Sequence, residues 1–125
     1  MSGGPVLDEA TIAQLFEAVG SDPAFLDELA AAYLADAPEQ LAAARAAIAA
    51  GSVDDLIRPA HTLKSSSATL GATKLAGLAR ELEQGARGGS LDGAEAGLMA
   101  AEAEFARVST AIAERRRSGW RLSTW

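Results

Sequence analysis

Apolar residues recur along this chain at the spacing of three to four residues that is typical of amphipathic helices. Five stretches show this pattern, and they are separated by glycine, serine or aspartate residues that can end or cap a helix. The first stretch is short and is closed by Gly20, and the second runs on to Gly51. The predicted helices span about residues 8–19, 21–50, 53–70, 72–87 and 91–117.

Two prolines fall inside predicted helices, where a proline removes a backbone donor and crowds the preceding turn. Pro38 interrupts the second stretch, and Asp36 and Glu39 flank it with the spacing of a capping box. This stretch is therefore either one kinked helix or two stacked helices. Pro59 lies two residues before His61, so the third stretch has either a local kink or a late start.

The fifth stretch keeps a strict seven-residue repeat of apolar residues, which is typical of a bundle seam. Leu91, Leu98, Phe105 and Ile112 take one position of the repeat, and Ala94, Ala101 and Val108 take the other. The connections between the four long stretches are short, which favours antiparallel neighbours. We therefore predict an all-α fold, an up-down four-helix bundle with a short additional N-terminal helix.

The ends of the chain differ in character from the helical part. Residues 8–117 are predicted to form the bundle, between a flexible N-terminus at residues 1–7 and a C-terminal tail at residues 118–125. The tail holds both tryptophans of the protein, Trp120 and Trp125. It is either a frayed end or a hydrophobic latch onto the bundle or onto a partner.

Composition and charge exclude several classes of function. A length of 125 residues fits one domain, and the absence of cysteine excludes disulfides and thiolate metal sites. A single histidine argues against a metal site made by the protein alone. The net charge of -6 opposes binding to nucleic acids. Because no long apolar run and no secretory leader is present, we expect a cytoplasmic protein that does not bind membranes. We also expect the protein to be a monomer.

The single histidine, His61, is predicted to be exposed. On a helical wheel of about 100° per residue, the apolar positions of the third stretch fall in one narrow sector. That sector holds Leu56, Ala60, Leu63, Ser67 and Leu70. His61 lies about 135° from the centre of the sector, which excludes a place in the core. It is then either an incidental surface residue or a reactive group.

The neighbours of His61 on the helix suit the transfer of a phosphoryl group. A neutral imidazole is a nucleophile that can attack the phosphorus of an acyl phosphate. Lys64, three residues on, can hold its ammonium group beside the phosphoryl oxygens, and beside an exposed histidine this role is favoured over that of a solvated surface lysine. Ser65 can donate a hydrogen bond from one turn away. Small side chains around His61 leave access for a partner, and the predicted docking surface includes Ile57, Arg58 and Ala68.

The segment AHTLKSSSATLG, residues 60–71, resembles the signature of histidine-containing phosphotransfer domains, and ATKLAGLARELE, residues 72–83, continues the likeness. The resemblance implies that His61 is phosphorylated and that Lys64 is its charge partner. It also implies that Glu83 orients the inner imidazole nitrogen, although glutamate there could equally be a surface residue. Ser65 departs from the pattern, because the family most often has glycine at this position, and this departure could narrow the choice of partner.

The resemblance implies a phosphoryl carrier that has no ATP site or kinase activity of its own. We expect a protein of a two-component phosphorelay that accepts a phosphoryl group from a receiver-domain aspartate onto His61 and passes it to another receiver. Its partners would be response-regulator receiver domains and a hybrid histidine kinase. It would need no cofactor, with Mg²⁺ expected in the receiver. The alternatives are a helical adaptor without phosphotransfer, and the histidine-bearing domain of a chemotaxis-type or hybrid kinase.

Overall fold

The chain forms five α-helices in a computed structural model that describes residues 6–120. The part of the chain in this range has no β-strand, which confirms the predicted all-α fold. The helices are α1 (Glu9–Ala18), α2 (Pro23–Ala49), α3 (Val53–Thr69), α4 (Thr73–Arg87) and α5 (Ala94–Arg117).

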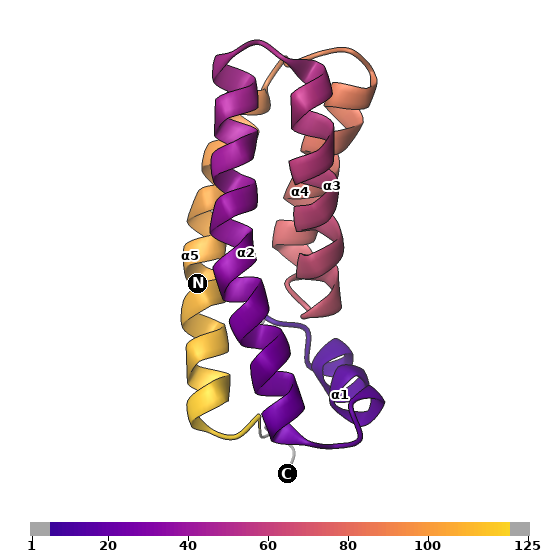
Figure 1. The fold of residues 1–125 in the computed structure, drawn as a ribbon, viewed down its shortest axis with the longest axis vertical. Coiled ribbons are helices and arrows are strands. Elements are labelled where there is room, and N and C mark those ends of the chain that lie inside the picture. Colours follow the sequence, from indigo (N-terminus) through magenta and orange to yellow (C-terminus); the bar gives the residue numbers. More distant parts are fainter. Residues whose placement is uncertain (1–5, 121–125) are drawn as a thin grey trace.

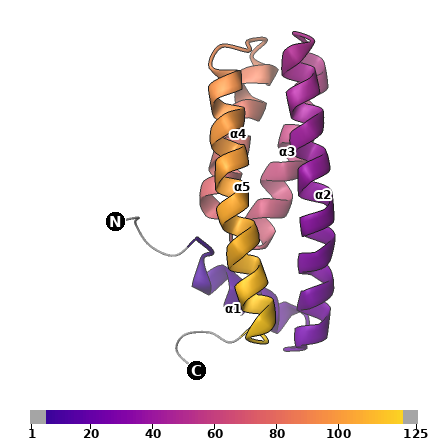
Figure 2. The ribbon, with the colours of Figure 1, turned by 90° about the vertical axis from the view of Figure 1, so that its left-hand side faces the viewer.

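The four long helices run alternately up and down and form a closed bundle (Figures 1 and 2). Each helix packs on two neighbours, because α3 lies between α2 and α4, and α5 lies between α4 and α2. Helices α2 and α5 have 27 and 24 residues, whereas α3 and α4 have 17 and 15. The longer pair therefore extends past the shorter pair at one end, and α1 fills the space beneath α3 and α4 (Figure 1).

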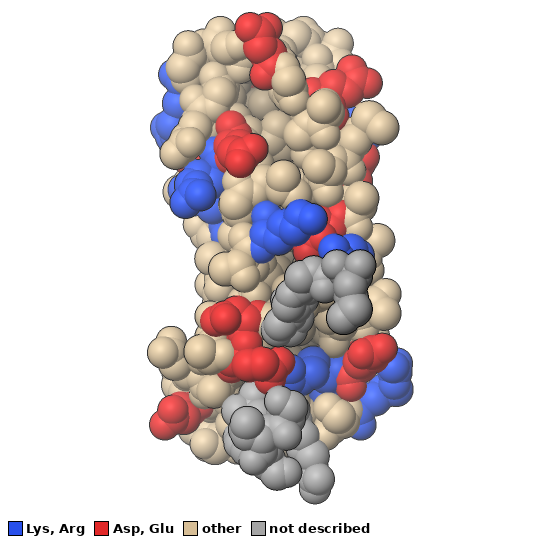
Figure 3. All heavy atoms as spheres, turned by 180° about the vertical axis from the view of Figure 1, so that it is seen from behind, with Lys and Arg blue, Asp and Glu red and all other residues tan. Residues whose placement is uncertain are grey.

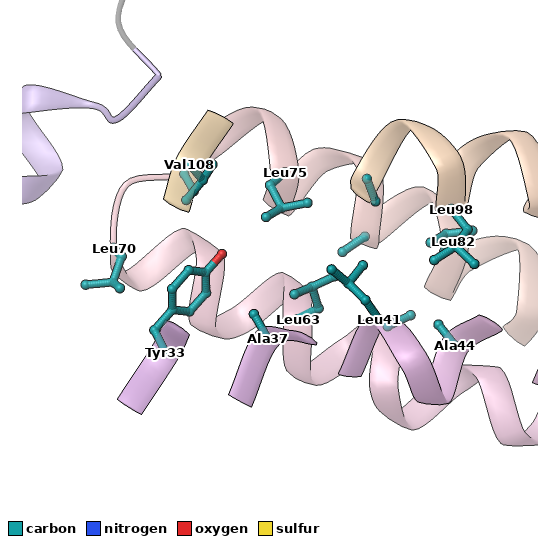
Figure 4. Close-up of a cluster of buried hydrophobic side chains, with 14 of the residues drawn as sticks. Tyr33, Ala37, Leu41, Ala44, Leu63, Leu70, Leu75, Leu82, Leu98 and Val108 are labelled. Carbon is teal, nitrogen blue, oxygen red and sulfur yellow. The ribbon is translucent and has the colours of Figure 1, made fainter. Parts of the chain in front are cut away.

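The core is made mainly of leucine and alanine side chains that meet at the centre of the four long helices (Figure 4). The predicted inner face of α3 is confirmed, since every residue assigned to it is at least 98% buried. Its one polar member, Ser67, shares a hydrogen bond of 2.8 Å with the Tyr33 hydroxyl of α2. Burial raises the pKa of Tyr33 to about 12, so the hydroxyl stays neutral inside the core. The pair thus satisfies two polar groups that would otherwise be costly to bury.

Helix α1 is attached to the bundle at the end of α3. Gly71 follows α3 with φ of 77°, a backbone conformation that favours glycine. Its carbonyl accepts a hydrogen bond of 2.8 Å from the backbone N–H of Asp8, which caps α1. A Cβ at position 71 would lie 3.1 Å from the Asp8 carbonyl oxygen. A side chain there would therefore push α1 away from α3.

The structure resolves the two proline alternatives. Helix α2 is one continuous helix through Pro38, whose side chain is exposed, so the alternative of two stacked helices is wrong. Helix α3 begins at Val53, six residues before Pro59, so the alternative of a late start is wrong as well. In both helices the packing of the turns on either side holds the helix together despite the missing backbone donor.

The fifth helix begins at Ala94, three residues later than its apolar repeat predicts. Gly93 precedes it with φ of 74°, and the Ser90 hydroxyl accepts a hydrogen bond from the backbone N–H of Asp92. These features form a turn where the repeat indicates a helix. Leu91 is still half-buried, so it packs at its position of the apolar repeat although it lies outside the helix.

The packed part of the chain extends past both predicted ends of the bundle. Leu7, which the sequence pattern places in a flexible N-terminus, is 3% exposed and belongs to the core. Trp120 is 1% exposed, and its indole Nε1 donates a hydrogen bond of 2.6 Å to Asp27 of α2. The burial of Trp120 favours a tail that latches onto the bundle over a frayed end. Trp125 lies outside the described residues.

The surface carries charges of both signs. On the face opposite the view of Figure 1, basic and acidic side chains are interspersed (Figure 3). Between residues 6 and 120, no helix has both the length and the hydrophobicity needed to cross a membrane.

Candidate functional site

His61 lies in the middle of α3, and 52% of its side chain is exposed. Its neighbours Ala60 and Leu63 are buried, so the backbone around the histidine is fixed by the core. This arrangement confirms the exposure that the helical wheel predicts. It gives an imidazole that is open to a partner while its helix is held rigidly.

Glu83 of α4 contacts the inner nitrogen of the imidazole. Its Oε2 lies 3.0 Å from His61 Nδ1, and only 6% of the Glu83 side chain is exposed. An ionised carboxylate can only accept hydrogen bonds, so Nδ1 carries the proton and donates it. The lone pair of a neutral ring is then on Nε2. Of the two interpretations of Glu83, the geometry fits the contact with His61 and not a surface residue.

Two cations balance the buried carboxylate of Glu83. Lys64 Nζ lies 2.8 Å from Oε1, and Arg87 Nε donates a hydrogen bond of 2.8 Å to Oε2. The Lys64 ammonium is the main cause that lowers the pKa of Glu83 to about 2, and Arg87 and His61 lower it further against the opposing effect of burial. Glu83 is therefore ionised at neutral pH. With a neutral His61, two cations and one carboxylate leave a local charge of +1, which favours an incoming anion.

The sequence predicts the Lys64 ammonium group beside the imidazole, but in the structure it does not stand free there. Its ammonium group is paired with Glu83, and its side chain is 31% exposed. Ser65 is exposed on the turn after His61, and within the described residues its hydroxyl makes no hydrogen bond to the site. The structure thus brings Lys64 and Glu83 together with His61 and leaves Ser65 at the rim.

The three residues assigned to partner docking share the outer surface of α3 with His61. Ile57 is half-buried, whereas Arg58 and Ala68 are exposed. Ile57 lies one turn before His61, and Ala68 lies two turns after it. They form an apolar rim around the imidazole with one basic side chain at its edge.

Sequence reasoning missed Arg87. This residue follows Glu83 by four positions on α4, which is the spacing of side chains that meet on a helix. That spacing was the available signal, but it points to the site only once Glu83 is known to face His61. Within residues 6–120, no cluster of histidine and acidic side chains has the arrangement needed to hold a metal ion.

Comparison with known proteins places this site in a family. The family model described as Hpt domain matches residues 28–113, a range that includes His61, Lys64, Glu83 and Arg87. The fold is similar to the crystal structure of histidine-containing phosphotransfer protein B (HptB) from Pseudomonas aeruginosa PAO1, with a TM-score of 0.82 and 34% sequence identity. That match covers 93% of this chain and 98% of the other. No curated protein sequence matched. The chain therefore belongs to the family of histidine-containing phosphotransfer (Hpt) domains, which carry phosphoryl groups in phosphorelays.

Proposed function

We propose that His61 accepts a phosphoryl group from the aspartate of a response-regulator receiver domain and passes it to another receiver. The observation that carries this proposal is the contact of 3.0 Å between Glu83 Oε2 and His61 Nδ1. It assigns the proton to the inner nitrogen and leaves the nucleophilic lone pair on the exposed side of the ring.

The transfer step uses this lone pair directly. Nε2 forms a bond to the phosphorus of the acyl phosphate while the bond from phosphorus to the aspartate oxygen breaks, and its electron pair stays on the carboxylate. The ring then holds a phosphoryl group on Nε2 and a proton on Nδ1, and it bears a positive charge. The Glu83 carboxylate, hydrogen-bonded to Nδ1, balances that charge. The reverse step returns the phosphoryl group to a second aspartate.

Two side chains on α3 can stabilise the phosphoryl group. Lys64 lies one turn after His61, and its ammonium group can pair with the phosphoryl oxygens once it leaves Glu83. Ser65, exposed on the same turn, can donate a hydrogen bond from its hydroxyl. Mg²⁺ would be supplied by the receiver. We propose that the chain is a carrier without kinase activity of its own and that a hybrid histidine kinase stands upstream. The cytoplasmic location and monomeric state expected from the sequence stay predictions.

The test of this function is to mix the protein with a panel of receiver domains that carry a radioactive phosphoryl group. Transfer of label to this chain by at least one receiver, and its return to a second receiver, is the expected result. A helical adaptor would bind a receiver without taking up label. A domain that serves only a kinase would be labelled by that kinase and by no receiver.

Lys64→Ala should slow transfer by about tenfold without abolishing it, since the lost charge pair is worth about 1.4 kcal/mol once a partner excludes water. The nucleophile remains, and Arg87 still pairs with Glu83 in this variant. The measurement is the rate of label transfer from one receiver at saturating concentration. Lys74→Ala, an exposed lysine on α4 that pairs with Glu104 of α5, is the matched control and should transfer at the native rate. Equal rates for native protein and Lys64→Ala would remove Lys64 from the mechanism.

Ala68→Arg should weaken receiver binding by about tenfold or more, because a long charged side chain would stand in the apolar rim beside His61. Ala68 is exposed, so the bundle should keep its stability. Binding is measured by titration with an unphosphorylated receiver. Ala106→Arg, on the exposed surface of α5, adds the same charge away from His61 and serves as the control. Native affinity in Ala68→Arg would place the docking surface elsewhere.

A further inference from the structure

The Lys64 ammonium group has two partners, Glu83 and the phosphoryl group on His61, and it cannot pair with both at the same time. In the structure its ammonium group lies 2.8 Å from Glu83 Oε1, whereas the proposed function requires it beside the phosphoryl group on His61. The ammonium group must therefore leave Glu83 when a phosphoryl group arrives. Its side chain is 31% exposed, so its end has access to the outer face of α3.

The departure of Lys64 would leave a buried carboxylate without its main counter-charge. Only 6% of the Glu83 side chain is exposed, and a buried charge without a partner is costly. Glu83 also holds the imidazole ring through Nδ1, so a shift or protonation of the carboxylate would disturb the nucleophile. Until the phosphoryl group has bonded to Nε2 and the ring has become positive, a second cation is needed to keep Glu83 ionised and in place.

Arg87 meets this need because it binds the other oxygen of the carboxylate. Its Nε donates to Oε2, which also accepts from His61, while Lys64 occupies Oε1. Arg87 and Glu83 stand one turn apart on the same helix, α4, so a movement of the Lys64 side chain on α3 does not break their contact. We propose that Arg87 is a positioning residue that holds Glu83 on His61 while Lys64 moves from Glu83 to the phosphoryl group. This inference rests on the proposed function of His61.

The test is a double-mutant cycle with Arg87→Ala and Glu83→Gln. Glutamine at position 83 can still accept a hydrogen bond from Nδ1, but it carries no charge and needs no cation. Arg87→Ala alone should slow transfer by about fivefold, and in the Glu83→Gln background it should change the rate by less than about twofold. Arg87→Lys should restore most of the native rate, because an ammonium group can also pair with Oε2. Arg80→Ala removes an exposed arginine from the same helix and should leave the rate unchanged in both backgrounds.

Thermal unfolding of each variant first checks that it is folded. Equal slowing by Arg87→Ala in both backgrounds would overturn the inference, since Arg87 would then act on the phosphoryl group or on the partner directly. A native rate for Arg87→Ala would overturn it as well. If receivers label the native protein and either of these results is found, the inference about Arg87 is contradicted and the proposed function of His61 stands. Failure of every receiver to label the native protein would contradict the proposed function and, with it, the inference.

Discussion

His61→Gln should take up no label from any phosphorylated receiver, while its affinity for the same receiver stays close to native. Glutamine keeps a similar size and can make hydrogen bonds, but it has no nitrogen lone pair that can attack phosphorus. His61 is half-exposed and is not one of the residues of the hydrophobic core, so the variant should fold normally. The measurements are label transfer followed on a gel and receiver binding followed by titration.

The chemical stability of the label gives an independent check. A phosphoryl group on nitrogen is lost in acid and kept in base, whereas a phosphoserine survives acid and an acyl phosphate is lost in base. Native protein should therefore lose its label in acid only. Label that persists in His61→Gln, or that resists acid, would point to a hydroxyl such as that of Ser65 or Ser66 and would contradict phosphorylation of His61.

Trp120→Ala should lower the free energy of unfolding by about 3–5 kcal/mol, the range for removing a large aromatic side chain from a core. The indole is 1% exposed and belongs to the main hydrophobic cluster, and its Nε1 donates to Asp27. Trp120 also adopts φ of 67°, a conformation unfavourable for a residue other than glycine, so its burial must outweigh that cost. Chemical denaturation, followed by the helical signal in circular dichroism, measures the change.

Two further variants separate the causes of this effect. Trp120→Phe keeps most of the buried area and loses the hydrogen bond, so it should cost about 1 kcal/mol beyond any loss of packing. Met99→Ala, at a position on α5 that is 58% exposed, should change stability by less than about 0.5 kcal/mol. If Trp120→Ala were as stable as Met99→Ala, Trp120 would not be the latch that the structure indicates.

The apolar period of the sequence was enough to predict the bundle and the exposure of His61. Both depend on a local property, because side chains 3.6 residues apart face the same side of a helix wherever that helix lies. Glycines such as Gly51 and Gly71 end a helix through their own backbone angles, so the helix ends can also be predicted from the local sequence. The signature around His61 added the chemistry, and the family comparison agrees with it.

On α5 the apolar repeat alone does not predict which side chains are buried. The seven-residue repeat assigns Phe105 to the core, yet Phe105 is half-buried and the adjacent Glu104 is 4% exposed. The buried Glu104 carboxylate has two cationic partners. Its Oε1 lies 3.4 Å from Nη1 of Arg107 and 3.9 Å from Nζ of Lys74 on α4. A repeat of 3.5 residues drifts against the helix period of 3.6, so which side chain turns inward depends on the neighbouring helix.

The sequence by itself determined the helices, the inner face of α3 and the outward direction of His61, since these follow from spacing along one segment. Only the tertiary structure decided which groups meet across segments: Glu83 with His61, Arg87 behind Glu83, and Trp120 against Asp27. These contacts depend on how far α3 and α4 are offset along their axes and on where the end of α5 meets α2. Packing of whole helices fixes those relations, and no pattern within a single helix records them.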